Sequence, residues 1–116
     1  MGKRDETPRK WVYLSGKVTG MDKEATREYF ARYQKHYEER GYAVFDPMEK
    51  AETYIEGYKK IYQGTAPSEE GVMLYLILEL SQCDIVAMLP GWENSYGAQI
   101  ERLWAMRHGK EVMYAE

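Results

Sequence analysis

Three residues near the carboxyl end of the chain, Ser95, Gly97 and Glu101, have types and a spacing that could do chemistry. Ser95 and Gly97 stand at the start of a predicted helix, where free backbone N–H groups can bind a phosphate or a carboxylate. Glu101 follows about one turn later, on the side of the helix that leans toward its apolar face. A carboxylate there is either a functional group or a residue at the edge of the core, and most helical glutamates are simply solvated. The spacing alone leaves both interpretations open.

Two further segments offer polar groups directly after predicted strands. Ser15, Gly16 and Lys17 open a turn that runs to Gly20, and its glycines permit close approach of a ligand to the backbone. The spacing matches neither the P-loop nor the dinucleotide-binding fingerprint, so an ordinary strand-to-helix turn is an equal alternative. Asp46 follows the second predicted strand, where it could contact a ligand or only form a turn.

Short apolar runs alternate with helical patterns along the chain, and this alternation sets the fold class. Strands are expected over residues 11–14, 42–45, 84–89 and 112–114, and helices over 22–40, 48–64, 68–80 and from 94 or 95 to 107. This order predicts a single-domain, doubly wound and mostly parallel α/β sheet of four to five strands, Rossmann- or flavodoxin-like. Ligands bind such sheets at the carboxyl ends of the strands. The three polar segments should therefore converge at that edge.

Two of the predicted helices have apolar patterns that indicate what covers them. In the first helix, apolar residues recur every four positions and predict a face packed on the core: Ala25, Tyr29, Tyr33 and Tyr37. The third helix is apolar nearly all round from Val72 to Leu80, which a helix tolerates only if several of its faces are covered. We therefore expect a homodimer or higher homo-oligomer through the Val72–Leu80 helix.

The composition excludes several classes of function. A chain of 116 residues fits one domain, expected over 11–116 after a disordered, charged tail over 1–10. A net charge of −3 provides no field for a nucleic-acid polymer, so a small molecule is the expected partner. The charged N-terminus and the short apolar stretches predict neither secretion nor a membrane partner. A single cysteine fits a reducing compartment, and we expect the protein in the cytoplasm.

Four residues of reactive type have plain structural explanations. His36 and His108 each stand alone in the sequence, so no metal site is predicted. Cys83 precedes a buried strand and is expected to be an inert core thiol. Asp84 lies at the start of that strand, opposite the ligand-binding edge, and is expected to be structural.

Three stretches of the chain resemble the nucleoside 2-deoxyribosyltransferase superfamily. They are residues 13–16 (YLSG), 46–47 (DP) and 83–101 (CDIVAMLPGWENSYGAQIE). Within that superfamily the chain looks most like small phage and bacterial proteins of a domain family of unknown function (DUF4406-like). The resemblance runs from about Trp11 to Tyr114, nearly the whole chain.

The resemblance implies cleavage or exchange of the N-glycosidic bond of a (deoxy)nucleoside or its 5′-monophosphate. Glu101 would attack the anomeric carbon and form a covalent glycosyl–glutamate intermediate, which water or a second base resolves. No cofactor is implied, because the substrate itself carries the activated carbon. Tyr13 would orient the glutamate, and Ser95 and Gly97 would hold the 5′ end of the sugar or its phosphate. The remaining implied substrate contacts are Ser15, Gly16, Lys17, Asp46 and Trp92.

Two positions depart from the superfamily pattern. An aspartate that assists protonation of the base usually stands eight residues before the position of Asp84, where this chain has Leu76. The first turn also lacks the arginine of the monophosphate hydrolase, which leaves Lys17 as the nearby cation. Leu76 favours an alternative function, a catalytically inactive nucleotide-binding module. A structural protein that acts through the Val72–Leu80 surface is a third possibility.

Overall fold

The computed structural model describes residues 9–18, 20 and 22–116. The expected tail over 1–10 therefore falls mostly outside the described residues, as does Thr19 of the first turn. The strands are β1 (Trp11–Ser15), β2 (Ala43–Phe45), β3 (Ile85–Met88) and β4 (Glu111–Tyr114). The helices are α2 (Lys23–Glu38), α3 (Pro47–Ile61), α4 (Glu69–Leu80) and α5 (Tyr96–Arg107), with a short 3₁₀ helix, η1 (Trp92–Asn94), before α5.

The strands form one parallel sheet with the order β2-β1-β3-β4. This arrangement confirms the predicted doubly wound α/β class, with four strands in the described part of the chain. At the carboxyl end of the sheet, Ser15 of β1 lies beside Met88 of β3. The chain leaves β1 toward β2 and later enters β3 on the opposite side of β1. The switch point, where ligands bind in this fold class, therefore lies between the carboxyl ends of β1 and β3.

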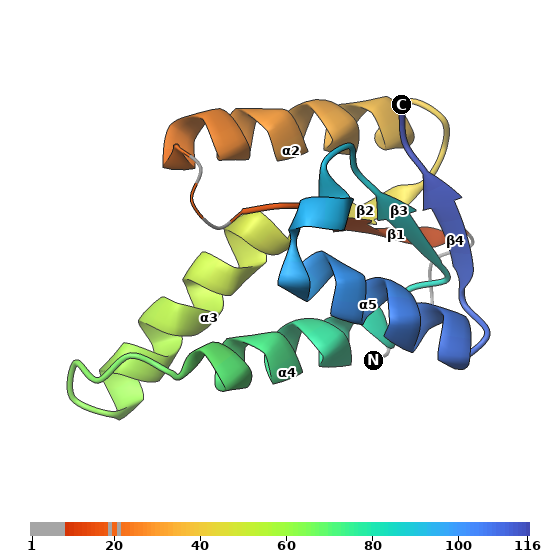
Figure 1. Cartoon of the computed structure of the whole chain (residues 1–116). Coiled ribbons are helices and arrows are strands. Elements are labelled where there is room, and N and C mark those ends of the chain that lie inside the picture. The colour runs from red at the N-terminus through yellow and green to blue at the C-terminus, as the bar shows by residue number, and fades with distance from the viewer. Residues whose placement is uncertain (1–8, 19, 21) are drawn as a thin grey trace.

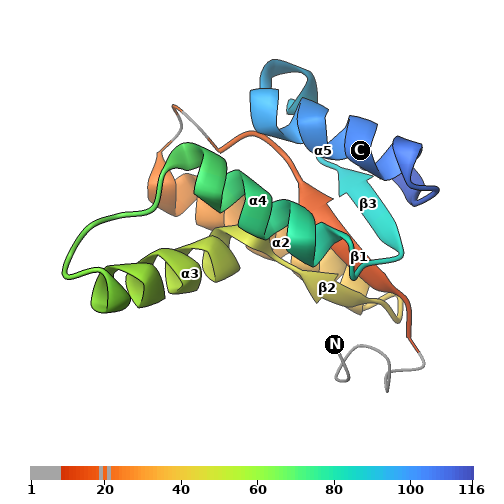
Figure 2. The same ribbon diagram turned by 90° about the horizontal axis from the view of Figure 1, so that it is seen from below.

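Helices cover both faces of the sheet. Helix α2 lies on one face, whereas α3, α4 and α5 lie on the other (Figure 1). Seen from below in Figure 2, α4 is on the near side of the molecule. Successive side chains of β1 point to opposite layers. Val12 and Leu14 belong to the core cluster that includes Phe30 of α2, whereas Tyr13 belongs to the cluster that includes Leu80 of α4 and Ala105 of α5.

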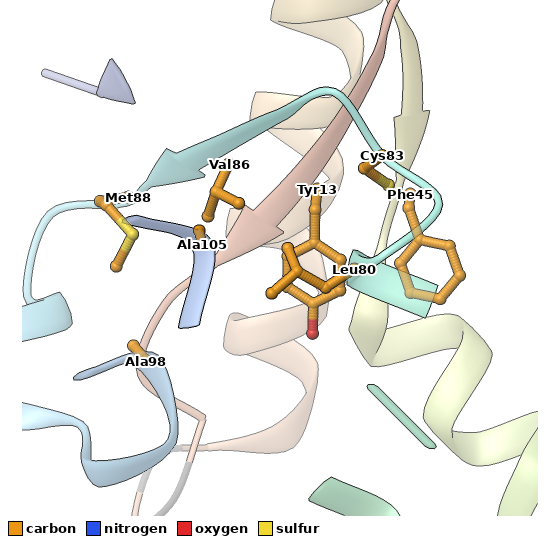
Figure 3. Close-up of a cluster of buried hydrophobic side chains, with 8 residues drawn as sticks. All are labelled: Tyr13, Phe45, Leu80, Cys83, Val86, Met88, Ala98 and Ala105. Atoms are coloured by element: carbon orange, nitrogen blue, oxygen red, sulfur yellow. The ribbon is translucent and has the colours of Figure 1, made fainter. Parts of the chain in front are cut away.

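The second of these clusters encloses Tyr13 among apolar side chains. Tyr13 is fully buried, and its ring stacks on that of Phe45 with 5.4 Å between centroids. Among the eight side chains drawn in Figure 3, Tyr13 alone carries an oxygen, at the end of its ring. A buried hydroxyl needs a hydrogen-bond partner. The Tyr13 hydroxyl is thus a polar atom among apolar side chains, and its partner is described below.

Side-chain caps fix where the helices begin. Asp22, Asp46, Ser68 and Ser95 each accept a hydrogen bond from a backbone N–H two or three residues later, at the starts of α2, α3, α4 and α5. The sequence left open whether Asn94 or Ser95 caps the last helix. Ser95 is the cap, because Asn94 closes η1.

The buried face of α2 differs from the predicted stripe. Thr26, Phe30 and Tyr37 are buried, whereas Ala25 is exposed. Residues four positions apart on an α-helix drift by about 40° at each step, so a stripe of that spacing winds off one face within three steps. The prediction was therefore wrong for Ala25 and right for Tyr37, and also for Tyr29 and Tyr33, which are partly buried and pack against the core cluster.

Two further expectations can be compared with the described residues. The Asp84 Oδ2 atom accepts a hydrogen bond from the Trp11 backbone N–H at 2.8 Å, which ties the loop before β3 to the start of β1, as a structural residue would. Cys83 is a buried free thiol. No helix in the described ranges is long and apolar enough to cross a bilayer.

Candidate active site around Glu101

Glu101 is a buried carboxylate held by two buried hydroxyl groups. The Tyr13 hydroxyl donates a hydrogen bond to Oε2 of Glu101, and the Ser15 hydroxyl donates to Oε1 at 2.6 Å. Glu101 is 6% exposed, and Tyr13 and Ser15 are 0% exposed. Both carboxylate oxygens therefore have a specified donor, so the group is held in one orientation inside the protein.

Strand and helix periodicity together bring these three side chains to one place. Tyr13 and Ser15 lie two residues apart on β1 and so point to the same face of the sheet. Glu101 lies between Ala98 and Ala105 on the buried face of α5. Small residues on either side of it let α5 approach the sheet closely. The site thus lies at the predicted switch point, between β1 and the helix that follows β3.

The environment sets how Glu101 ionises. Burial raises the pKa of Glu101 to about 7, although the hydrogen bonds from Ser15 and Tyr13 act in the opposite direction. The pKa of Tyr13 is raised well above its ordinary value, first by burial and then by the charge of Glu101. Tyr13 therefore remains a neutral donor across the physiological range. Glu101 changes its charge near neutral pH, which suits a group that acts as a nucleophile or exchanges protons.

The start of α5 lies close to α4. The Ser95 hydroxyl accepts a hydrogen bond from the Ala98 backbone N–H at 3.2 Å, so it serves as the helix cap. A Cβ atom added to Gly97 would lie 3.1 Å from the terminal methyl of Met73 in α4. Gly97 is thus a point of close contact between the two helices. No local sequence pattern predicts this contact, because Met73 and Gly97 are far apart along the chain.

Gly16 and Lys17 follow β1 directly. A Cβ atom added to Gly16 would lie 3.1 Å from the Leu89 Cβ atom and 3.4 Å from the Phe30 ring. The glycine therefore has a packing role that the sequence did not predict, in addition to the ligand approach that it permits. Lys17 is half-buried beside it.

Asp46 directly follows Phe45, the residue of β2 that pairs with Tyr13 of β1. Its Oδ1 atom accepts a hydrogen bond from the Met48 backbone N–H at 2.9 Å, which caps α3. Burial raises the pKa of Asp46. The residue lines a groove of about 420 Å³ between α2 and α3, together with Arg27 and Glu52, and the Arg27 guanidinium binds the Glu52 carboxylate. Glu101 does not line this groove.

Trp92 is partly buried and packs against the cluster that contains Tyr13. Its ring is 5.9 Å from that of Tyr114, and the Arg102 guanidinium lies 5.1 Å above it. Trp92 and Arg102 line a cavity of about 350 Å³ that does not include Glu101. Hydrogen bonds join Tyr13, Ser15 and Glu101, whereas Asp46 and Trp92 each line a cavity whose lining does not include Glu101.

Helix α4 covers this side of the sheet with apolar side chains. Leu76 and Ile77 pack against the cluster that contains Tyr13. Leu76 is thus a packing residue of the layer that holds Tyr13. The described residues contain no group of three or more histidine, cysteine, aspartate or glutamate side chains that could hold a metal ion.

A comparison with protein-family models identifies the chain. Residues 10–114 match the model of the "Domain of unknown function (DUF4406)". The chain belongs to this family. The match covers β1 through β4 and therefore includes every residue of the Glu101 site in the DUF4406 domain. No curated protein and no solved structure matches the chain.

Proposed function

We propose that this DUF4406 protein cleaves or exchanges the N-glycosidic bond of a (deoxy)nucleoside or its 5′-monophosphate, with Glu101 as the nucleophile. One observation carries the proposal. Glu101 is buried at the switch point of the sheet, and each of its oxygens accepts a hydrogen bond from a hydroxyl of β1. The resemblance of residues 83–101 to nucleoside 2-deoxyribosyltransferases supports the substrate class.

The chemistry requires only the carboxylate and an acceptor. An oxygen of ionised Glu101 forms a bond to the anomeric carbon while the bond from that carbon to the base nitrogen breaks, and the electron pair leaves with the base. The base takes up a proton from the solvent. Water or a second base then attacks the same carbon and releases a proton to the solvent, and Glu101 leaves as a carboxylate. Two displacements retain the configuration of the sugar.

The hydroxyls of Tyr13 and Ser15 act on Glu101 by position and by charge. Each donor fixes one oxygen and stabilises the ionised form, against the burial that raises the pKa. A free electron pair on each oxygen stays available for attack. Because Glu101 is 6% exposed, substrate entry requires displacement of side chains that cover it. Those of α4 are the candidates, since Met73 and Leu76 lie on that side.

A nucleotide-binding module without catalysis is the second candidate, and Leu76 is the observation that favours it. An apolar side chain cannot donate a proton to a departing base, and general acid catalysis of this kind contributes about 100-fold or more. If the protein does cleave the bond despite Leu76, bases that depart without a proton donor should be its better substrates.

The test is release of free base, measured by chromatography. Wild type and Glu101→Gln are incubated with deoxynucleosides, ribonucleosides and their 5′-monophosphates, with and without an acceptor base. Glu93→Gln, at an exposed glutamate of η1, is the matched control. We expect release or exchange by wild type and Glu93→Gln, and none by Glu101→Gln.

The outcomes separate the two candidates. Turnover that persists in Glu101→Gln would overturn the proposed nucleophile. No turnover by wild type, together with a rise in melting temperature when nucleotides are added, would establish the binding module, since any ligand of the folded state stabilises it. Neither turnover nor a thermal shift would overturn both functions.

A further inference from the structure

Arg102 of α5 is a half-buried arginine that has no carboxylate partner among the described residues. Its Nε–H group donates a hydrogen bond to the Tyr114 hydroxyl at 2.7 Å. Its guanidinium lies 5.1 Å from the centre of the Trp92 ring and 5.9 Å from that of the Tyr114 ring. Tyr114 ends β4, which lies beside α5 (Figure 1). These neutral contacts hold the guanidinium in place without neutralising its charge.

Arg27 of α2 shows how this chain pairs another arginine. Its Nε and Nη2 atoms donate to the Glu52 carboxylate, and its Nη1 atom donates to the Glu24 carboxylate. By contrast, the two terminal nitrogens of Arg102 make no hydrogen bond within the part of the chain that the structure describes. A guanidinium presents its N–H groups as a planar fork that matches two oxygens of one anion. Arg102 is therefore oriented and available for an oxyanion.

The cavity beside Arg102 combines this cation with apolar walls. It has a volume of about 350 Å³, and its lining consists of Trp92, Glu93, Gln99, Arg102 and Leu103. Ligand sites commonly range from about 300 to 1,000 Å³, so this cavity suits a small molecule. Leu103 is 61% exposed, and a ring bound against it would remove apolar surface from water. The lining therefore fits a molecule that has both a ring and a negative charge.

The two remaining lining residues leave the guanidinium unneutralised. The Gln99 side-chain amide donates a hydrogen bond to the Glu93 carbonyl at 2.5 Å, which ties η1 to α5. Glu93 is exposed, and no ion pair joins its carboxylate to Arg102 in the described ranges. Even a formed ion pair between exposed groups stabilises little in water. The charge of Arg102 therefore remains for a ligand.

We propose that this cavity binds a small aromatic molecule that carries an oxyanion, either a carboxylate or a phosphate ester. The terminal nitrogens of Arg102 bind two oxygens of the anion, and the ring lies against Trp92 and Leu103. Glu101 does not line the cavity, so this ligand is additional to any substrate of Glu101. The inference does not rest on the proposed function.

Isothermal titration calorimetry at neutral pH tests the ligand class. Phenyl phosphate and benzoate carry the two kinds of oxyanion on one ring, and phenol is the same ring without a charge. We expect the tighter of the two anions to bind at least about tenfold more tightly than phenol, and that anion identifies the preferred group. Inorganic phosphate and acetate have the charge without the ring, and each should bind at least about tenfold more weakly than its aromatic counterpart.

Two results would overturn this ligand class. One is binding of phenol as tight as that of both aromatic anions, because the oxyanion would then contribute nothing. The other is the absence of binding by both aromatic anions at millimolar concentration.

Variants of two arginines locate the site. Arg102→Gln should weaken binding of the tighter anion by at least about tenfold, and Arg102→Lys, which keeps the charge but not the planar fork, by several fold. Arg32→Gln is the matched control, because Arg32 is exposed on α2 and also lies over a ring, that of Tyr29, at 5.7 Å. It should change the affinity by less than about twofold.

Leu103→Ala removes an apolar wall at an exposed position, where the fold depends little on the side chain, and should weaken binding by about three- to tenfold. Circular dichroism and melting curves show that each variant is folded. Unchanged affinity in both Arg102→Gln and Leu103→Ala would overturn the site. A loss in Arg32→Gln equal to that in Arg102→Gln would also overturn it, by showing that only the overall charge of the protein matters.

Discussion

The regions around Glu101 and Asp46 each bury a carboxylate near the carboxyl end of the parallel sheet, but they satisfy it differently. Asp46 accepts a backbone N–H at the start of α3. Glu101 accepts two side-chain hydroxyls from β1, outside any helix start. Every helix provides free N–H groups at its first turn, so a capping aspartate needs no further explanation. Buried hydroxyls aimed at both oxygens of a glutamate must be encoded one by one.

The two carboxylates also differ in what their titration can do. Burial raises the pKa of both, but for Glu101 the value is about 7. A carboxyl group with that pKa exists in both charge states at neutral pH. Helix capping accounts for the hydrogen bond of Asp46, whereas for Glu101 we propose a role in chemistry.

The largest predicted effect is a difference in activity between a variant of Glu101 and a variant of Asp46. Glu101→Gln removes the nucleophile but keeps the shape, so base release should fall by about 1,000-fold or more. Asp46→Asn keeps a capping oxygen and should retain activity within about tenfold. Steady-state assays of both variants on one substrate give the ratio. Equal losses in the two variants would remove the distinction between the regions.

The fold class and the candidate residue Glu101 could be predicted from the sequence, because the patterns that indicate them are local. The strand runs, the capping residues Asp22, Ser68 and Ser95, and the serine-to-glutamate spacing all act within a few residues of themselves. They predicted the elements, the α/β class and Glu101 as the candidate residue. The bond between Ser15 and Glu101 spans 86 positions and could not be predicted from local pattern.

What the sequence did not predict depends on tertiary packing. Which cavities Asp46 and Trp92 line depends on how α3 and η1 lie against the sheet. The drift of the α2 stripe away from Ala25 follows from counting in fours where the helix repeats at about 3.6 residues. The packing role of Gly16 requires two neighbours, Leu89 and Phe30, from separate elements.

The second effect concerns stability and its dependence on pH. Burial raises the pKa of Glu101 from 4.5 to about 7, so the folded state binds a proton that the unfolded state releases between these values. This contribution to stability is complete below pH 4.5 and declines as the pH rises through about 7, by about 3 kcal/mol in total. This pH-dependent contribution to stability is absent in Glu101→Gln, because a glutamine side chain does not titrate. The melting temperature of this variant should exceed that of wild type at about pH 8 and approach it below about pH 5.

Calorimetry of wild type, Glu101→Gln and Asp46→Asn across this range makes the measurement. Asp46→Asn should keep most of the wild-type slope, since its pKa is raised in the same direction but Glu101 is still present. A slope in Glu101→Gln as steep as in wild type would show that other groups control it.

The third prediction concerns a carboxylate introduced at position 76, where the chain has a leucine. Leu76→Asp places an acid on the side of α4 that packs against the cluster of Tyr13. If the protein is a glycosidase limited by departure of the base, release should rise by about 10- to 100-fold. Leu76→Asn has similar size and polarity but no acid, and should give no increase. A gain in both variants would indicate easier substrate entry in place of proton donation.

The smallest effect should come from one donor of the pair. Tyr13→Phe removes a hydrogen bond that lowers the pKa of Glu101, so that pKa should rise and the acid side of the pH–rate profile should move to higher pH. The maximal rate should fall by about tenfold. Tyr29→Phe, whose hydroxyl donates to the Pro90 carbonyl, is the control. An unchanged profile in Tyr13→Phe would exclude this role for the hydroxyl.

Strand β1 carries alternate residues of two kinds, and this has a consequence for selection in a variant library. Val12 and Leu14 serve only the packing under α2, whereas Tyr13 and Ser15 hold Glu101. A screen for folded protein should accept phenylalanine at position 13 and alanine at position 15, and a screen for turnover should reject them. The two screens should agree at positions 12 and 14. Four consecutive codons would then report, in alternation, on folding and on chemistry.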